Sequence, residues 1–224
     1  SLDDVADIYA VLGDGGSAGP SELTRLLVLT DGLDCEPAVL DAYHRAKKLL
    51  ADRPSYALTL KDSAADIRLA GFTVAARSLA DQLGDAPQTA PEKLSAELRY
   101  MLRYAASRSA EDLARAEAIL QRVRDQLLVA IGDDGLLLTP TTPQAAFLHS
   151  GRPPVTGASF TGLANIAGLP ALSVPAGVND DGLPVAVQLI GPAGSETRLI
   201  AAARTLEIGL GGFVPSPILD NNLG

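Results

Sequence analysis

The sequence predicts an α/β protein with a mixed central β-sheet flanked by helices. Short apolar runs of strand length alternate along the chain with longer stretches in which apolar residues recur at helical spacing. The 224 residues are 47% apolar and 20% charged, which is typical of a soluble globular protein with a sizeable core. No internal repeat or abrupt change of composition divides the chain, so we expect a single domain over 1–224.

Strands are predicted where apolar residues form a short continuous run, a pattern typical of strands covered on both faces. We expect the last three to share one sheet, with 136–139 central and none of them at a solvent-exposed edge. The predicted strands are 26–30, 56–60, 136–139, 171–174 and 185–190.

Helices are predicted where apolar residues recur every three or four positions. The clearest is 110–131, with Ser109 as N-cap, Asp112 in the capping-box position and Gly132 at its end. Ser195 is expected to cap the last helix. The predicted helices are 2–12, 37–51, 62–83, 91–106, 110–131, 160–167 and 196–208, and the predicted loops are 13–20, 84–91, 141–159 and the tail 215–224.

Charge and composition exclude several classes of function. With 27 acidic against 18 basic residues the net charge is −9, so nucleic acid and anionic membrane are poor partners. No apolar run reaches the roughly 20 residues that span a bilayer. The single cysteine, Cys35, fits a reducing cytoplasm, and with His44 and His149 it is too few for a Cys/His zinc site. We therefore expect no zinc site of this kind.

The residues offer no self-sufficient active site. No Ser-x-x-Lys pair occurs, and the four lysines lie in helical or helix-edge contexts typical of surface charges. His44 lies within a predicted helix, where a partly exposed structural histidine is the ordinary interpretation. The chain by itself is thus a domain without an evident nucleophile and base.

Several segments in a fixed order resemble the C-terminal half of the amidase signature family. They are the runs Leu-Leu-Leu-Thr-Pro-Thr-Thr-Pro at 136–143, Phe-Thr at 160–161, Asn-Ile-Ala-Gly-Leu-Pro-Ala at 165–171, Ser-Val-Pro-Ala-Gly at 173–177, Gly-Leu-Pro-Val at 182–185 and Gln-Leu-Ile-Gly-Pro at 188–192. The best-matching segment is 135–208, and weaker similarity extends to 1–6.

The resemblance implies an amide hydrolase that converts a carboxamide to an acid and ammonia or an amine through a serine acyl-enzyme, with no metal and no organic cofactor. That family uses a lysine and two serines, and the Ser/Gly-rich motif that carries the serines would precede Ser1. No catalytic residue can therefore be carried over to this chain, which is expected to be inactive alone. The expected partners are the N-terminal half of the same enzyme, or a second copy through an apolar surface bordered by 2–12, and a small amide substrate.

Pocket-lining residues are expected at the end of one strand and in the loop that follows, where ligand sites of α/β proteins form. They are Thr141, Thr142, Phe147, Ser159 and Phe160. The other matching residues are interpreted as structural: prolines set chain direction at strand ends, glycines allow tight turns, Asn165 bonds a loop backbone and Gln188 is a buried polar residue satisfied by backbone. This structural set is Pro140, Pro143, Asn165, Gly168, Pro170, Pro175, Gly177 and Gln188.

Two alternatives to the hydrolase stay open. The chain could be a non-catalytic module or processed subunit that binds a partner chain. It could also belong to the glutaminase subunit of a tRNA-dependent amidotransferase. That subfamily carries an aspartate three residues before the threonine matched by Thr161, and here Ala158 takes that place, so the α-amino group of glutamine would lack its counter-charge.

Overall fold

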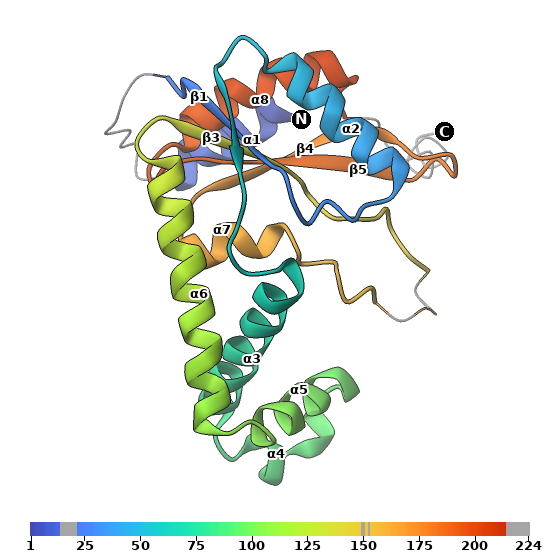
Figure 1. Ribbon diagram of the computed structural model, residues 1–224. Helices are drawn as coiled ribbons and strands as arrows, with labels where there is room; N and C mark the ends of the chain where they lie inside the picture. The colour runs from blue at the N-terminus through green and yellow to red at the C-terminus, as the bar shows by residue number, and fades with distance from the viewer. Residues whose placement is uncertain (14–21, 149–150, 152, 214–224) are drawn as a thin grey trace, which may run out of the picture.

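A mixed β-sheet forms the centre of the computed structural model, which describes residues 1–13, 22–148, 151 and 153–213. Its strands are β1 (Arg25–Leu29), β2 (Ser55–Leu58), β3 (Gly135–Pro140), β4 (Ala171–Val178) and β5 (Pro184–Ile190). Within the described residues the five strands lie in the order β2-β1-β3-β5-β4 (Figure 1). β1 is parallel to β2 and β3, whereas β5 is antiparallel to β3 and β4. The predicted fold class is confirmed.

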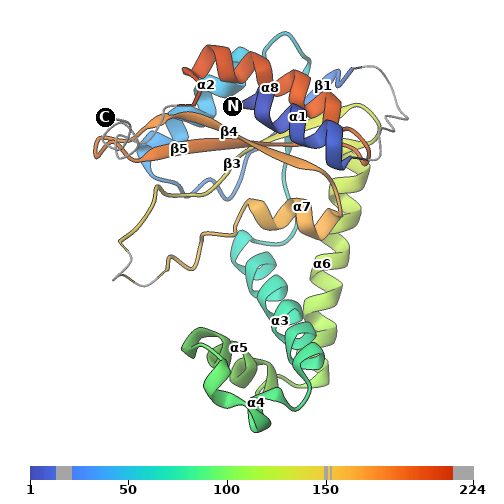
Figure 2. The ribbon, with the colours of Figure 1, turned by 180° about the vertical axis from the view of Figure 1, so that it is seen from behind.

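One face of the sheet is covered by helices that come from both ends of the chain (Figure 2). They are α1 (Leu2–Leu12), α2 (Pro37–Leu49) and α8 (Glu196–Leu210). Alternate strand residues point to this face and join the helices in one apolar cluster, which includes Leu136 and Leu138. Tyr43 of α2 is buried in it, and its hydroxyl donates to the Leu29 carbonyl at 3.3 Å.

The opposite face of the sheet packs against α6 (Ala110–Ile131) and α7 (Thr161–Ala167). Leu137 lies between Leu136 and Leu138 and points to the other face of the sheet. It joins Leu127 of α6 and Leu163 of α7 in the second apolar cluster. The predicted capping box of α6 is confirmed, because the Ser109 hydroxyl accepts from the Asp112 amide and the Asp112 carboxylate accepts from the Ser109 amide.

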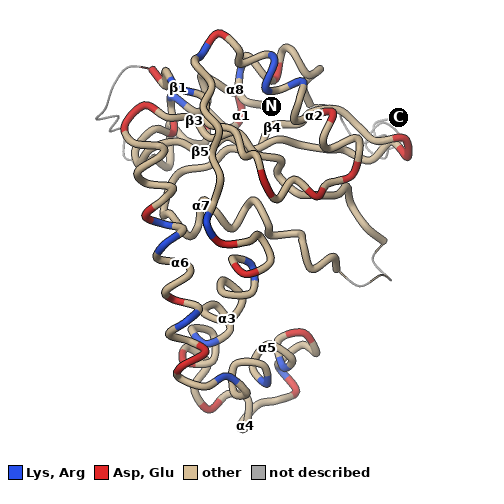
Figure 3. Tube along the Cα trace, in the orientation of Figure 1, with Lys and Arg blue, Asp and Glu red and all other residues tan. Residues whose placement is uncertain are grey.

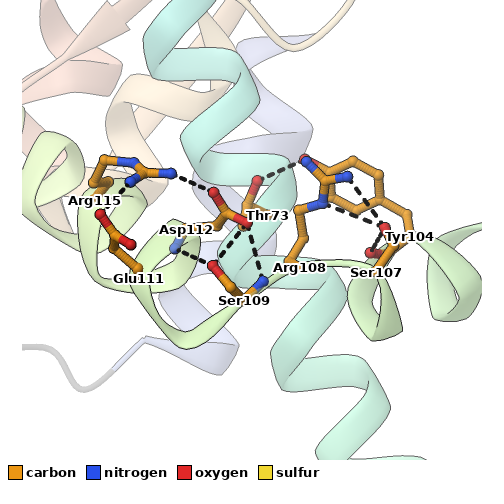
Figure 4. Close-up of polar contacts among 8 residues, drawn as sticks. All are labelled: Thr73, Tyr104, Ser107, Arg108, Ser109, Glu111, Asp112 and Arg115. Carbon is orange, nitrogen blue, oxygen red and sulfur yellow. Dashed lines mark hydrogen bonds and ion pairs between the residues drawn. The ribbon is translucent and has the colours of Figure 1, made fainter.

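A helical arm extends from this face, away from the sheet (Figure 1). It consists of α3 (Ala64–Leu83), α4 (Ala86–Thr89), a 3-10 turn (Pro91–Lys93), α5 (Ala96–Ala106) and the N-terminal part of α6. α3 packs along both α5 and α6. The junction between α5 and α6 is fastened to α3 by polar contacts around Tyr104, whose hydroxyl lies 2.9 Å from the Thr73 hydroxyl (Figure 4).

The predicted places of the last three strands are right for two of them and wrong for the third. β3 is central and buried at every position, and β5 lies inside the sheet. β4 lies at the edge of the sheet formed by the described residues, where Ala171 and Ser173 are exposed while Val174 and Ala176 are buried. The error has a physical cause: this run alternates between faces, so it is covered on one face only.

Local details differ from the predicted boundaries. The expected loop 84–91 contains α4, and the expected helix 91–106 begins with the 3-10 turn before α5. Ser195 precedes α8, but its buried hydroxyl makes no capping hydrogen bond. The predicted loop after Gly13 and the tail 215–224 lie outside the described residues. None of the described helices combines the length and apolar character that crossing a membrane requires.

Candidate functional site

A cavity of about 320 Å³ opens where the parallel strands β1 and β2 end. Ligand sites of α/β proteins form at such carboxyl ends, because the loops that leave neighbouring strands meet there. Apolar side chains of both strand ends, α3 and α7 make up most of the wall, and charged residues stand among them. The lining residues are Leu29, Asp31, Gly32, Leu60, Lys61, Asp62, Ser63, Ala64, Ile67, Ser159, Phe160 and Leu163.

Ser159 and Phe160, both predicted from the sequence as pocket residues, line this cavity. Phe160 is 2% exposed and packs in the apolar cluster beneath α7. The Ser159 hydroxyl accepts a hydrogen bond from Nη1 of Arg68 on α3, at 3.3 Å. The loop before α7 is therefore tied to α3 across the cavity wall.

Thr141, Thr142 and Phe147 do not line the cavity. The Thr141 hydroxyl lies 2.8 Å from the Ser173 hydroxyl on β4, and the Thr142 hydroxyl donates to the Gln144 carbonyl at 2.7 Å. Phe147 is 50% exposed. The structure thus places these three residues on the loop that leaves β3, outside the cavity that Ser159 and Phe160 line.

Glu36 anchors the beginning of that loop, a contact that the sequence did not reveal. The Glu36 amide donates to the Pro143 carbonyl at 2.8 Å, and the Glu36 carboxylate accepts from the Ala145 amide at 3.1 Å. Pro140, the last residue of β3, pairs with Val187 of β5. The chain direction after β3 is therefore fixed by a proline and by a side chain that lies more than 100 residues earlier.

Gln188 holds the backbone of Phe160 in place from the neighbouring strand. Its side chain is 4% exposed, and Nε2 donates to the Phe160 carbonyl and to the Thr139 hydroxyl, each at 3.3 Å. Buried polar groups require such partners, because leaving one unpaired is costly. The cavity wall thus rests on a buried polar contact with the sheet.

Asn165 and Gly168 shape α7. Asn165 Nδ2 donates to the Thr161 carbonyl one turn earlier, so this asparagine bonds helix backbone, and the predicted bond to a loop backbone is wrong. Gly168 ends the helix with φ 68°, a left-handed conformation that glycine adopts without steric cost. Arg124 of α6 donates to the Ile166 carbonyl at 3.2 Å and so satisfies part of the same helix end.

Pro170, Pro175 and Gly177 belong to the edge of the sheet. The Pro170 carbonyl accepts from the Gly191 amide at 3.2 Å, and the pairing of β4 with β5 becomes irregular between Pro175 and Val178. Gly177 has φ 104°, which disfavours other residues. These residues therefore set the path of an edge strand and take no part in the cavity.

The charges around the cavity are partly neutralised by neighbours. Asp62 accepts from Nη2 of Arg122 at 2.7 Å, and this contact raises the pKa of the guanidinium. Within the described residues, Asp31 and Lys61 form no ion pair, so both charges face solvent at the cavity mouth. No sequence pattern marked Asp31, Lys61 or Arg68, since single charged residues after a strand or within a helix are common on surfaces.

In the described part of the chain, no serine, threonine or cysteine side chain forms a hydrogen bond with the side chain of a lysine or histidine. Burial, with a smaller contribution from Asp34, raises the pKa of the Cys35 thiol to about 11, so it is protonated at neutral pH. No cluster of described His, Cys, Asp or Glu residues could hold a metal ion.

Comparison with known proteins decides the family. The family model described as Amidase matches residues 35–200. The chain belongs to the amidase signature family. A solved amidase structure aligns with a TM-score of 0.76 and 21% identity over 94% of this chain and 51% of that chain. The A subunit of the glutamyl-tRNA(Gln) amidotransferase from Thermotoga maritima aligns at a TM-score of 0.54 and 24% identity, over 83% of this chain and 42% of that one. These likenesses show the amidase signature fold.

Curated members of the family match over a shorter segment at higher identity. The A subunit of the glutamyl-tRNA(Gln) amidotransferase of Gluconobacter oxydans is 41% identical over 98 residues, which are 42% of this chain and 20% of that protein. Its counterpart in Deinococcus radiodurans is 41% identical over 102 residues, 42% of this chain and 21% of that protein. The matched segment thus spans about a fifth of these amidase signature relatives.

Proposed function

We propose that this chain is the carboxyl-terminal portion of an amide hydrolase that works through a serine acyl-enzyme. The observation that supports it is the cavity at the ends of β1 and β2, in a chain of the amidase signature family. In the proposed reaction a serine outside this sequence attacks the carboxamide carbon and expels ammonia or an amine. Water then releases the acid. The lysine and second serine that move the proton also lie outside this sequence.

The chain's own contribution is to bind the substrate. Phe160, Leu163 and Ile67 give the cavity an apolar wall, which suits an aliphatic or aromatic acyl group. Gln188 and Arg68 fix the loop of Phe160 and Ser159, so the wall is held before the substrate arrives. No metal or organic cofactor takes part in the proposed reaction, and we place the enzyme in the cytoplasm.

The glutaminase subunit of a tRNA-dependent amidotransferase is a second candidate, favoured by the names of the curated relatives. Recognition of glutamine requires a counter-charge for its α-amino group, and Ala158 stands where that subfamily carries aspartate. A simple amide without an α-amino group makes no such demand. We therefore favour the amide hydrolase.

Association with another polypeptide is proposed from the exposed face of α1. Val5, Ile8, Val11 and Leu12 are 38%, 59%, 82% and 78% exposed. Apolar side chains gathered on one helix face usually mark an interface. We propose that the amino-terminal half of the enzyme covers this face, with a second copy of the chain as the substitute when that half is missing. A non-catalytic module would use the same face for a partner chain.

Hydrolysis assays test the proposal. The purified chain alone is expected to release no ammonia from benzamide, hexanamide or glutamine. The chain joined to the segment encoded upstream in its reading frame is expected to hydrolyse benzamide or hexanamide faster than glutamine. A Phe160→Ala variant of the joined protein should raise KM for benzamide, whereas Phe147→Ala, which alters an exposed side chain outside the cavity, serves as control.

Each contrary result has a clear meaning. Turnover by the chain alone, lost when one of its own serines or lysines is replaced, would contradict the placement of the catalytic residues. Preference for glutamine would favour the tRNA-dependent amidotransferase. An upstream frame without a Ser/Gly-rich stretch and a lysine would favour the non-catalytic module.

A further inference from the structure

A second cavity, at the far end of the helical arm, is lined by arginines from two helices. Arg77 comes from α3, and Arg99 and Arg103 come from α5. The cavity has a volume of about 400 Å³ and shares no residue with the candidate site at β1 and β2. The other lining residues are Ala80, Gly84, Pro87, Gln88, Leu102 and Ala106.

The backbone of the arm fixes two of these guanidinium groups. Arg99 Nη1 donates to the Leu94 carbonyl at 2.7 Å and to the Pro91 carbonyl at 3.1 Å. Arg77 Nη2 donates to the Arg108 carbonyl at 3.4 Å. A guanidinium has five N–H donors, so each keeps donors for a ligand after these contacts. Arg103 lies one helical turn after Arg99, on the same face of α5.

A polar and aromatic network around Tyr104 holds α5 against α3, the two helices that carry the cavity arginines; Figure 4 shows its polar contacts. Tyr104, next to Arg103, contacts the Thr73 hydroxyl and packs edge-on against Phe72 with ring centroids 4.9 Å apart. The Arg108 guanidinium lies 4.8 Å from the centre of the Tyr104 ring. The helices that carry the three arginines, and the guanidinium groups of Arg77 and Arg99, are therefore in place before any ligand binds, which lowers the entropic cost of binding.

The charge of this cavity is unbalanced. Figure 3 shows acidic and basic residues interspersed along the arm, yet among the described residues no Asp or Glu lines this cavity. In the same part of the chain Arg77, Arg99 and Arg103 form no ion pair with a carboxylate. Like charges gathered around one hollow repel each other, so an anion that enters it relieves that repulsion. The positive charge around this cavity contrasts with the net charge of the whole chain, which is −9.

We propose that this cavity binds a small molecule that carries a phosphate group. The planar fork of arginine matches phosphate oxygens, and three forks around one space suit a tetrahedral dianion better than a single planar carboxylate. The volume exceeds that of the phosphate, and Leu102, Pro87 and Ala80 offer an apolar surface to the organic part. The site lies on the arm and not at the cavity of the proposed hydrolase, so its ligand is distinct from the amide substrate.

Calorimetric titration of the purified chain with phenyl phosphate, inorganic phosphate, benzoate and phenol tests the proposal. Phenyl phosphate should bind in a saturable way and more tightly than inorganic phosphate, and benzoate and phenol should bind at least about tenfold more weakly than phenyl phosphate. Arg103→Gln is the main variant, because this exposed side chain makes no hydrogen bond to other described residues. It should raise Kd for phenyl phosphate about tenfold or more, because it removes one guanidinium group that donates charge-assisted hydrogen bonds to the phosphate.

Controls separate a site from a general effect of charge. Arg204→Gln removes an equal charge on α8, where Arg204 pairs with Asp3, and should leave Kd within about twofold. Arg103→Lys keeps the charge without the fork and should weaken binding less than Arg103→Gln. Absence of saturable binding of phenyl phosphate, or equal effects of Arg103→Gln and Arg204→Gln, would overturn the proposal. Equal affinity for benzoate would overturn the choice of phosphate.

Discussion

Replacing Gln188 by leucine tests whether the sheet supports the cavity wall. The substitution removes the donor to the buried Phe160 carbonyl and to the Thr139 hydroxyl while it keeps a side chain of similar size. The Phe160 carbonyl keeps the Leu163 amide as a donor at 3.1 Å, so the change removes a buried hydrogen bond and does not leave this acceptor without a partner. A hydrogen bond of this kind contributes about 0.5–1.5 kcal/mol. We expect a fall of about 1 kcal/mol in the free energy of unfolding.

Urea unfolding followed by circular dichroism measures this loss. A fall of that size corresponds to roughly 2–4 °C in Tm for a chain of this length. The double variant Gln188→Leu with Thr139→Val should lose less than the sum of the two single variants, because both changes remove members of the same contact. An unchanged midpoint for Gln188→Leu would show that the Gln188 side chain adds nothing to stability beyond the Leu163 amide that also donates to the Phe160 carbonyl, and the reasoning about the cavity wall would be refuted.

Further predictions concern a helix end, a thiol and an exposed face. Gly168→Ala should lower the free energy of unfolding in urea by about 1 kcal/mol, because φ at this position is 68°. Gly162→Ala, inside α7 and with nothing within 4 Å of the added carbon, should raise this free energy or leave it unchanged. The reverse order of the two variants would contradict the left-handed cap. Alkylation of Cys35 by iodoacetamide should be slow at pH 7 and should become faster as the pH rises toward the thiol pKa of about 11. In the unfolded chain the thiol should already react near pH 8.5, the ordinary pKa of cysteine. Equal rates for the folded and unfolded chains would disprove the effect of burial. Val11→Glu with Leu12→Glu should reduce binding of an apolar dye and self-association measured by light scattering; no change would show that this face of α1 is not an interface.

Most of the correct predictions depend on residues that lie close together in the sequence. The α6 helix follows from its apolar spacing and from Ser109 and Asp112, which cap it with bonds between residues three apart. β3 follows from an uninterrupted apolar run. In contrast, the exposure of β4 depends on its place in the sheet. It is the last strand in the order, and no other strand of the described residues pairs with its outer edge. The sequence of β4 is rich in apolar residues, which predicts a covered position. The alternation of its residues between buried and exposed is harder to recognise from the sequence.

The sequence by itself determined the fold class and most helices and strands, because backbone sterics, capping and apolar periodicity act over a few neighbouring residues. The family was predicted separately, from the resemblance of the ordered motifs between 136 and 192. It also marked Ser159 and Phe160 as pocket residues, from their place in a loop after a strand. Only the tertiary structure decided the strand order, the contact of Arg68 with Ser159, and the arginine-lined cavity of the arm. Arg68 and Ser159 are 91 positions apart, and such contacts arise from the packing of whole elements, which no local pattern encodes.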